Sequence, residues 1–179
     1  MLLTILLLAA DVVAVTAFYI TTRKKLGVPN NLSITYYEFE PKLRYFFPIV
    51  NVFLCLTGGP VWIYMTCHAS EWGRMFIAVP IITCICMMLV AASFDYKRSK
   101  GLIRFHYAVA WIACLGIILW LNAVGWRIAW FGLTIMSGFL LAGMYTKTLK
   151  SSPLFWLEMS AFYSLSATLL VVTIFQVQI

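Results

Sequence analysis

Six long runs of apolar residues limit this chain more than any other feature of its sequence. Each is about 20 residues long, the length that an α-helix needs to cross the hydrocarbon core of a bilayer. None shows the strict alternation of apolar and polar residues that barrel strands require, so all six are predicted to be helices. The runs are residues 2–21, 45–67, 74–93, 104–123, 126–145 and 153–176.

The small proportion of charged residues supports the same conclusion. Charged residues make up 11% of the 179-residue chain and hydrophobic residues 63%, whereas a soluble domain carries roughly 25% charged residues. A chain this short cannot hide so much apolar surface inside a globule, so its solvent must be lipid. The predicted fold is all-α: one polytopic integral membrane domain over residues 1–179, built as a bundle of six transmembrane helices.

Basic residues gather in alternate connections between the runs. The second and fourth connections hold two, Arg74 and Arg127, and the first, third and fifth hold the other eleven. Because cytoplasmic loops carry the excess of Lys and Arg, we expect the odd connections in the cytoplasm and both termini outside, in a bacterial inner membrane. The net charge of +7 then orients the chain, and we expect no nucleic acid partner. Positive charge after the first run, with none before it, predicts a retained helix and not a cleaved signal peptide.

The odd connections also hold the candidate contacts for lipid or for a partner protein. The first connection reads RKKLGVPNNLSITYYEFEPKLR, and its polar, aromatic second half predicts a short interfacial or re-entrant element. The third connection contains the densest basic cluster of the chain. The candidate contact residues are Arg23, Lys24, Lys25, Tyr36, Tyr37, Lys97, Arg98, Lys100 and Arg104.

Asp11 lies near the centre of the first run. Burying an ionised carboxylate in hydrocarbon is costly, so the side chain should face protein, with Asn51 or the hydroxyls of the last run as its partners. Those hydroxyls recur at every fourth residue and share one helix face: Ser160, Ser164 and Thr168. Two interpretations stay open: Asp11 either fixes helix packing through a hydrogen bond or couples to ions or protons. Glu158 is predicted to be structural, because it lies in the first turns of a helix, where the dipole favours negative charge.

Two prolines lie inside or near the start of predicted helices. Gly58-Gly59-Pro60 occupies the middle of the second run, and Pro80 follows the first turn of the third. Proline removes a backbone donor and clashes with the preceding turn, so both positions predict kinks. Kinked helices line cavities in transporters, which favours a channel or small transporter among the alternatives.

The two histidines do not form a metal site. Under the expected topology His68 and His106 lie on opposite faces of the membrane, separated by roughly the 30 Å of the hydrocarbon core. A catalytic zinc needs three protein ligands, and no histidine pair sits at matching depth for haem. We therefore expect no metal and no cofactor. The five cysteines have no spacing typical of a disulfide or zinc motif and are predicted to pack as small hydrophobic residues.

An ordered set of short motifs resembles a known family. Pro29 and Leu32-Ser33-x-Thr35 follow the first run, the third run ends with Ala92-Ser93-Phe94, and His106-Tyr107-x-x-Ala110 opens the fourth. Over roughly residues 1–145 this order resembles the Frag1/DRAM/Sfk1-like six-helix membrane proteins and the DUF998-type bacterial proteins near them. The resemblance implies a link to lipid remodelling, GPI-anchor maturation or autophagy. It also implies a first loop outside the cell, opposite to the charge distribution.

A wider grouping around that family includes metal-dependent lipid amidases that use Ser, Asp and several His. Ser93, Asp95 and His106 are the matching positions, whereas the further histidines of that group are missing here. Three function classes follow. The preferred one is a non-enzymatic membrane protein that binds lipid or a partner protein through its basic loops. The alternatives are an oligomeric channel or small transporter and a metal-dependent lipid-active enzyme. The expected partners are membrane lipids and either further copies of the chain or another membrane protein.

Overall fold

Residues 2–68, 76–123 and 126–175 are described by a computed structural model, and within these ranges the chain is helical and contains no strand. The α-helices are α1 (Leu2–Leu26), α2 (Thr35–Glu38), α3 (Phe46–His68), α5 (Ala78–Ala92), α6 (Lys100–Ala123), α7 (Trp126–Tyr145) and α8 (Pro153–Phe175), and a 3₁₀-helix, η1, spans Tyr96–Arg98.

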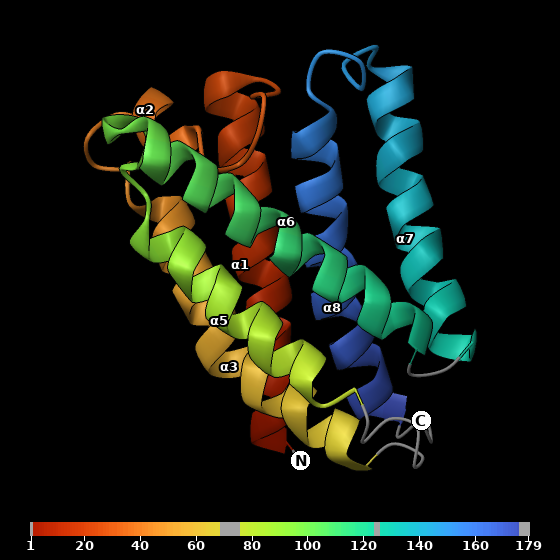
Figure 1. Ribbon diagram of the computed structural model, residues 1–179. Coiled ribbons are helices and arrows are strands. Elements are labelled where there is room, and N and C mark those ends of the chain that lie inside the picture. Colours follow the sequence, from red (N-terminus) through yellow and green to blue (C-terminus); the bar gives the residue numbers. More distant parts are fainter. Residues whose placement is uncertain (1, 69–75, 124–125, 176–179) are drawn as a thin grey trace.

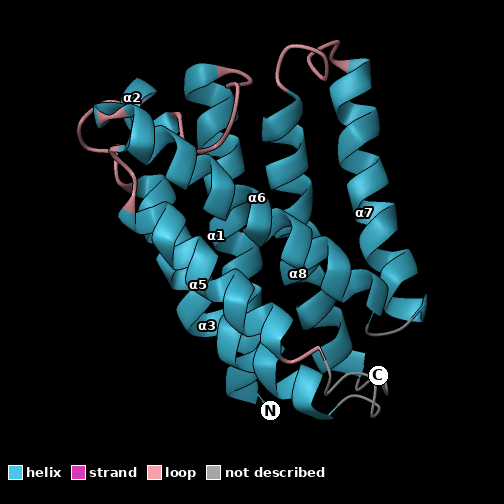
Figure 2. Ribbon diagram, in the orientation of Figure 1, coloured by secondary structure: helices cyan, strands magenta, loops and turns pink. Residues whose placement is uncertain are grey.

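The long helices form a bundle in which neighbours in space are mostly neighbours in sequence. α5 packs between α3 and α6, α1 packs between α3 and α8, and α7 packs on α8. α6 crosses obliquely and also contacts α7 and α8 (Figure 1). Residues 27–45, 93–99 and 146–152 connect helices at one end of the bundle, which we call the loop end (Figure 2). α1 begins and α8 ends at the opposite end.

Among the described residues, four helices are long and apolar enough to cross a membrane: α1, α3, α6 and α8. The apolar parts of the other two, Ala78–Ala92 and Trp130–Tyr145, are shorter. The structure therefore shows a helical protein whose apolar helices are compatible with a membrane. That all six runs cross the membrane stays a prediction. The predicted start of the third span, Arg74, lies outside the described residues.

Two helices are longer than predicted, and each extension has a local cause. α1 continues past residue 21 through Arg23, Lys24 and Lys25, where basic side chains interact favourably with the helix dipole. It ends at Gly27, whose φ of 74° suits glycine and whose N–H donates to the Arg23 carbonyl. α6 begins at Lys100 and not at residue 104, because the Ser99 hydroxyl accepts a hydrogen bond from the Leu102 N–H at 3.1 Å. The basic residues of both extensions therefore lie on helix ends and not in loops: Arg23, Lys24, Lys25, Lys100 and Arg104.

Neither proline interrupts its helix. α3 is continuous through Pro60, whose ring faces outward. Pro80 falls inside the first turn of α5, where the backbone N–H has no helical partner to lose. The prediction placed Pro80 beyond that turn, so the structure removes the reason to expect a kink there.

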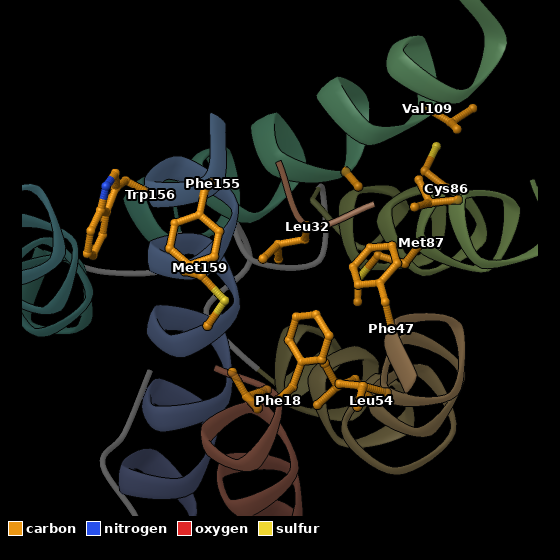
Figure 3. Packing of buried hydrophobic residues seen from close by; sticks show 14 of the residues in the cluster. Phe18, Leu32, Phe47, Leu54, Cys86, Met87, Val109, Phe155, Trp156 and Met159 are labelled. Atoms are coloured by element: carbon orange, nitrogen blue, oxygen red, sulfur yellow. The ribbon is translucent and has the colours of Figure 1, made fainter. Parts of the chain in front are cut away.

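The main hydrophobic core joins the loop end to the middle of the bundle. Phe18 of α1, Phe47 and Leu54 of α3, and Met87 of α5 point toward one another in Figure 3, with Leu32 from the first connection above them. Phe155, Trp156 and Met159 add the first turns of α8. Leu32 anchors the first connection against the bundle, since it is only 1% exposed.

Candidate functional site

Three segments meet at the loop end around a buried histidine. His106 Nδ1 lies 2.7 Å from Ser93 Oγ, and His106 Nε2 lies 2.7 Å from Ser33 Oγ. Tyr96 stacks on the imidazole, with ring centroids 4.2 Å apart and planes at 15°. We call Ser33, Ser93, Tyr96 and His106 the His106 cluster. All four are buried, and His106 is 0% exposed.

The His106 cluster ties together parts of the chain that are far apart in sequence. Ser33 precedes α2, Ser93 ends α5 and His106 lies in the second turn of α6. A neutral imidazole donates from one ring nitrogen and accepts at the other, so the two serine hydroxyls satisfy both nitrogens. Ser93 Oγ also lies 3.3 Å from the Val90 carbonyl. This geometry fixes the first connection, the end of α5 and the start of α6 against one another.

Asp95 belongs to a second and more exposed network beside the cluster. Its Oδ1 accepts a hydrogen bond from the Tyr37 hydroxyl at 3.1 Å, and the same hydroxyl oxygen accepts from the Lys97 N–H at 2.7 Å. Burial raises the pKa of the Tyr37 hydroxyl above its ordinary value, and Asp95 adds to that shift. Of the three residues matched to the lipid amidases, the structure thus joins Ser93 with His106 and pairs Asp95 with Tyr37.

The predicted contact residues surround this end of the molecule. The Arg23 guanidinium lies 6.0 Å from the Trp156 ring, and that of Arg44 lies 5.3 Å from the ring of Tyr36. Tyr36 itself is 8% exposed and packs against Phe94, so its position does not favour direct contact with lipid or a partner. Exposed basic side chains complete the surface: Lys24, Lys25, Lys97, Arg98, Lys100 and Arg104.

An open groove of about 430 Å³ lies where α5 ends and α6 begins. Five of its lining side chains are apolar: Leu89, Ala92, Phe94, Leu102 and Phe105. Three are polar: Ser93, Asp95 and Arg98. An apolar trough with a guanidinium at its loop end is suited to a molecule that has an apolar body and an anionic head.

Asp11 is buried, as predicted, with 1% of its surface exposed. Its partner differs from the prediction: the Thr57 hydroxyl contacts Asp11 Oδ1, whereas Asn51 Nδ2 donates to the Phe47 carbonyl. Ser164, one of the proposed hydroxyl partners, donates to the Gly132 carbonyl of α7 at 3.1 Å. That bond agrees with a packing role for the hydroxyl face of α8.

No family model matches this chain, and no curated protein or solved structure matches it either. The resemblance to the Frag1/DRAM/Sfk1-like proteins therefore stays a prediction, and the site is interpreted from its own geometry.

In the described part of the chain, no three His, Cys, Asp or Glu side chains come together as ligands. His106 lies in the second turn of α6, at the loop end, whereas His68 is the last residue of α3, where its ring contacts the Tyr64 carbonyl of the same helix at 2.9 Å.

Sequence reasoning missed three long-range contacts. Ser33 contacts His106, and Thr57 contacts Asp11. Glu158 Oε2 accepts a hydrogen bond from the Leu32 N–H at 2.7 Å, so this carboxylate holds the first connection onto α8. The Leu-Ser motif was the only local signal for any of these contacts, and it did not indicate a partner.

Proposed function

We propose that this protein is a six-span inner-membrane protein whose loop end faces the cytoplasm and binds anionic phospholipid in the groove between α5 and α6. The observation that carries the proposal is the groove itself, because Arg98 stands at the loop end of an apolar trough.

The apolar walls suit an acyl chain. Leu89 and Phe105 are 37% and 44% exposed, and α5 continues the same character with Ile82 and Ile85. In a membrane these side chains contact lipid, so the groove extends a surface on which acyl chains already lie. A phospholipid entering the groove from the bilayer keeps its chain in an apolar environment along its whole length.

Basic side chains in and beside the groove supply positive charge that complements an anionic headgroup. Arg98 lines the groove, and Lys97, Lys100 and Arg104 are exposed within the same stretch of chain. Each Lys or Arg near an anionic surface contributes about 1 kcal/mol of attraction. The His106 cluster holds the groove in shape, since Ser93 lines the groove and is bonded to His106.

Native mass spectrometry of the purified protein in detergent with added phosphatidylglycerol tests this function. We expect Arg98→Gln to weaken retention of phosphatidylglycerol about fivefold, which corresponds to the loss of about 1 kcal/mol. Lys150→Gln is the matched control, because Lys150 is an exposed basic residue at the loop end that does not line the groove. Equal loss in both variants, or equal retention of phosphatidylcholine by the unmodified protein, contradicts the proposal.

A further inference from the structure

Two of the five cysteines meet where helices α3 and α5 pack together. Cys55 Sγ lies 3.6 Å from the backbone carbonyl oxygen of Cys84, and the two thiols are also in hydrogen-bond contact with each other. Both residues line the same cavity of about 10 Å³. They are 29 residues apart in the sequence, so no local spacing indicates the pair, and only the packing of the two helices brings it together.

A glycine on α3 makes room for the Cys84 thiol. Gly59 follows Cys55 by one helical turn, so the two positions share one face of α3. A Cβ atom at position 59 would lie 3.1 Å from Cys84 Sγ, which is tighter than ordinary van der Waals contact. The thiol of Cys84 therefore rests on the face of α3 that carries Cys55, and it rests there because position 59 has no side chain.

The pair is accessible from the hydrocarbon of a membrane. Cys55 and Cys84 are both half-buried, and both lie near the middle of their helices. Ile81 and Met88 flank Cys84 on its own face of α5 and are 40% and 38% exposed. Charged reagents dissolved in water do not enter so apolar an environment. A molecule that reacts with these thiols must therefore be soluble in the bilayer.

The contact between the thiols suits the formation of a disulfide. A disulfide requires two cysteine side chains that point toward each other across a short gap. A hydrogen bond from one thiol also favours the thiolate form of the other, and the thiolate is the form that reacts. The contact between Cys55 and Cys84 provides both conditions at the interface of α3 and α5.

We propose that Cys55 and Cys84 are a redox-active dithiol that a membrane-soluble quinone oxidises to a disulfide between α3 and α5. Two S–H bonds break and one S–S bond forms. The quinone accepts both electrons and both protons and becomes a hydroquinone, so no further reactant is needed. A quinone fits this site because it dissolves in hydrocarbon and takes up electrons in pairs, as oxidation of a dithiol requires.

This activity goes beyond lipid binding and uses residues outside the groove. It rests on the membrane location of α3 and α5 and not on the presence of a phospholipid between α5 and α6. The disulfide would tie α5, which ends at the groove, to α3.

A count of free thiols tests the proposal. The purified protein in detergent is reduced with dithiothreitol, freed of the reductant, and incubated without oxygen with decylubiquinone and a metal chelator. After unfolding in SDS, a polyethylene-glycol maleimide adds one visible mass increment per free thiol. We expect five adducts in the reduced protein and two fewer after the quinone, with one hydroquinone formed per chain by absorbance. Dithiothreitol should restore all five, because it reduces a disulfide and does not reverse addition of a quinone to sulfur.

Single alanine variants assign the disulfide to the pair. Cys55→Ala and Cys84→Ala should each lose no further thiol to the quinone and form no hydroquinone. Cys86→Ala is the matched control, because Cys86 also lies on α5 but belongs to the main hydrophobic core, and this variant should still lose two thiols. A thermal unfolding curve shows whether each variant is folded.

Three results overturn the proposal. The first is retention of all five thiols by the folded, unsubstituted protein after the quinone. The second is loss of thiols in a folded Cys55→Ala or Cys84→Ala variant, which would mean that other cysteines react. The third is protection of a folded Cys86→Ala variant, which would place Cys86 in the disulfide.

Discussion

At the loop end His106 is buried with a hydrogen bond on each ring nitrogen, whereas in the middle of the bundle Asp11 contacts the Thr57 hydroxyl and lines a small cavity together with Trp62. Both regions bury polar groups inside an apolar bundle. The His106 cluster is closed by side chains from three segments. The Asp11 region adjoins a small cavity bordered by glycine.

This difference concerns how the central polar side chain of each region is held. Hydrogen bonds between side chains rigidify the segments that they join, so the two bonds of the His106 ring are suited to holding the groove in one shape. A polar group with one partner and adjacent space is held less tightly. Substitutions in the two regions should therefore differ in how much stability they remove, with the larger loss at the loop end.

The largest loss of stability is expected for His106→Ala. It removes both hydrogen bonds and the stacking with Tyr96, and leaves a cavity and the Ser33 hydroxyl without its partner, at a cost of about 3–4 kcal/mol. Unfolding by SDS in mixed micelles measures the change. His68→Ala is the control, since that ring is exposed and contacts the Tyr64 carbonyl of its own helix. Similar losses in the two variants would show that the buried His106 stabilises the fold no more than the exposed His68 does.

A smaller loss is expected for Asp11→Leu, because leucine removes the hydrogen bond with the Thr57 hydroxyl and overfills the space beside Gly58, at a cost of about 2 kcal/mol. Asp11→Asn keeps the size and hydrogen-bonding capacity of the protonated acid and should unfold close to the wild type. Thermal unfolding in detergent compares the two. A leucine variant as stable as the wild type would show that Asp11 has no buried partner of consequence.

Gly58→Ala should cost about 1–2 kcal/mol, because the new Cβ would lie 2.8 Å from Asp11 Oδ2 and force a shift. Gly138→Ala is the matched control, since no atom lies within 4 Å of its Cβ position, and alanine there should be neutral or stabilising by up to about 1 kcal/mol. The same unfolding assay measures both. Combining Gly58→Ala with Asp11→Ala should cost less than the sum of the two changes, because the second relieves the clash.

Tyr37→Phe should cost about 1 kcal/mol through its lost hydrogen bonds, and it should change the pH dependence of unfolding. Because the pKa of Tyr37 is raised in the folded state, its stabilising contribution is complete below its unfolded pKa of about 10 and is lost as the pH rises above that value. The wild type should therefore lose more stability than Tyr37→Phe between about pH 9 and about pH 11. Tyr145→Phe, at a side chain that is 91% exposed, should behave like the wild type.

No change of stability is expected for the last test, which concerns the side of the membrane. In a cysteine-free background, Ser99→Cys lies at the loop end and His68→Cys at the opposite end. An impermeant maleimide applied to intact cells should label position 68 and spare position 99. The reverse pattern would place the loop end, the groove and the His106 cluster outside the cell. Labelling at both positions would mean that the number of spans is wrong.

The sequence by itself determined the helical, lipid-compatible character of the chain and most helix positions. The run at 126–145 matches α7, and the run at 45–67 differs from α3 by one residue at each end. Such features depend on local hydropathy and length, which can be read without any knowledge of neighbours. The end of α1 and the start of α6 differ from the prediction. Both helices extend over basic residues, because charged residues are tolerated in terminal helical turns near the aqueous phase.

Only the tertiary structure decided which polar residues meet. Ser33 and His106 are 73 residues apart, Asp11 and Thr57 are 46 apart, and Leu32 and Glu158 are 126 apart. A membrane helix that is apolar on nearly every side does not reveal from its sequence how it is rotated about its axis, and rotation selects the facing residues. The conformation of the first connection is likewise not encoded in hydropathy. Packing therefore set Thr57 and not Asn51 against Asp11, and placed Glu158 beneath Leu32.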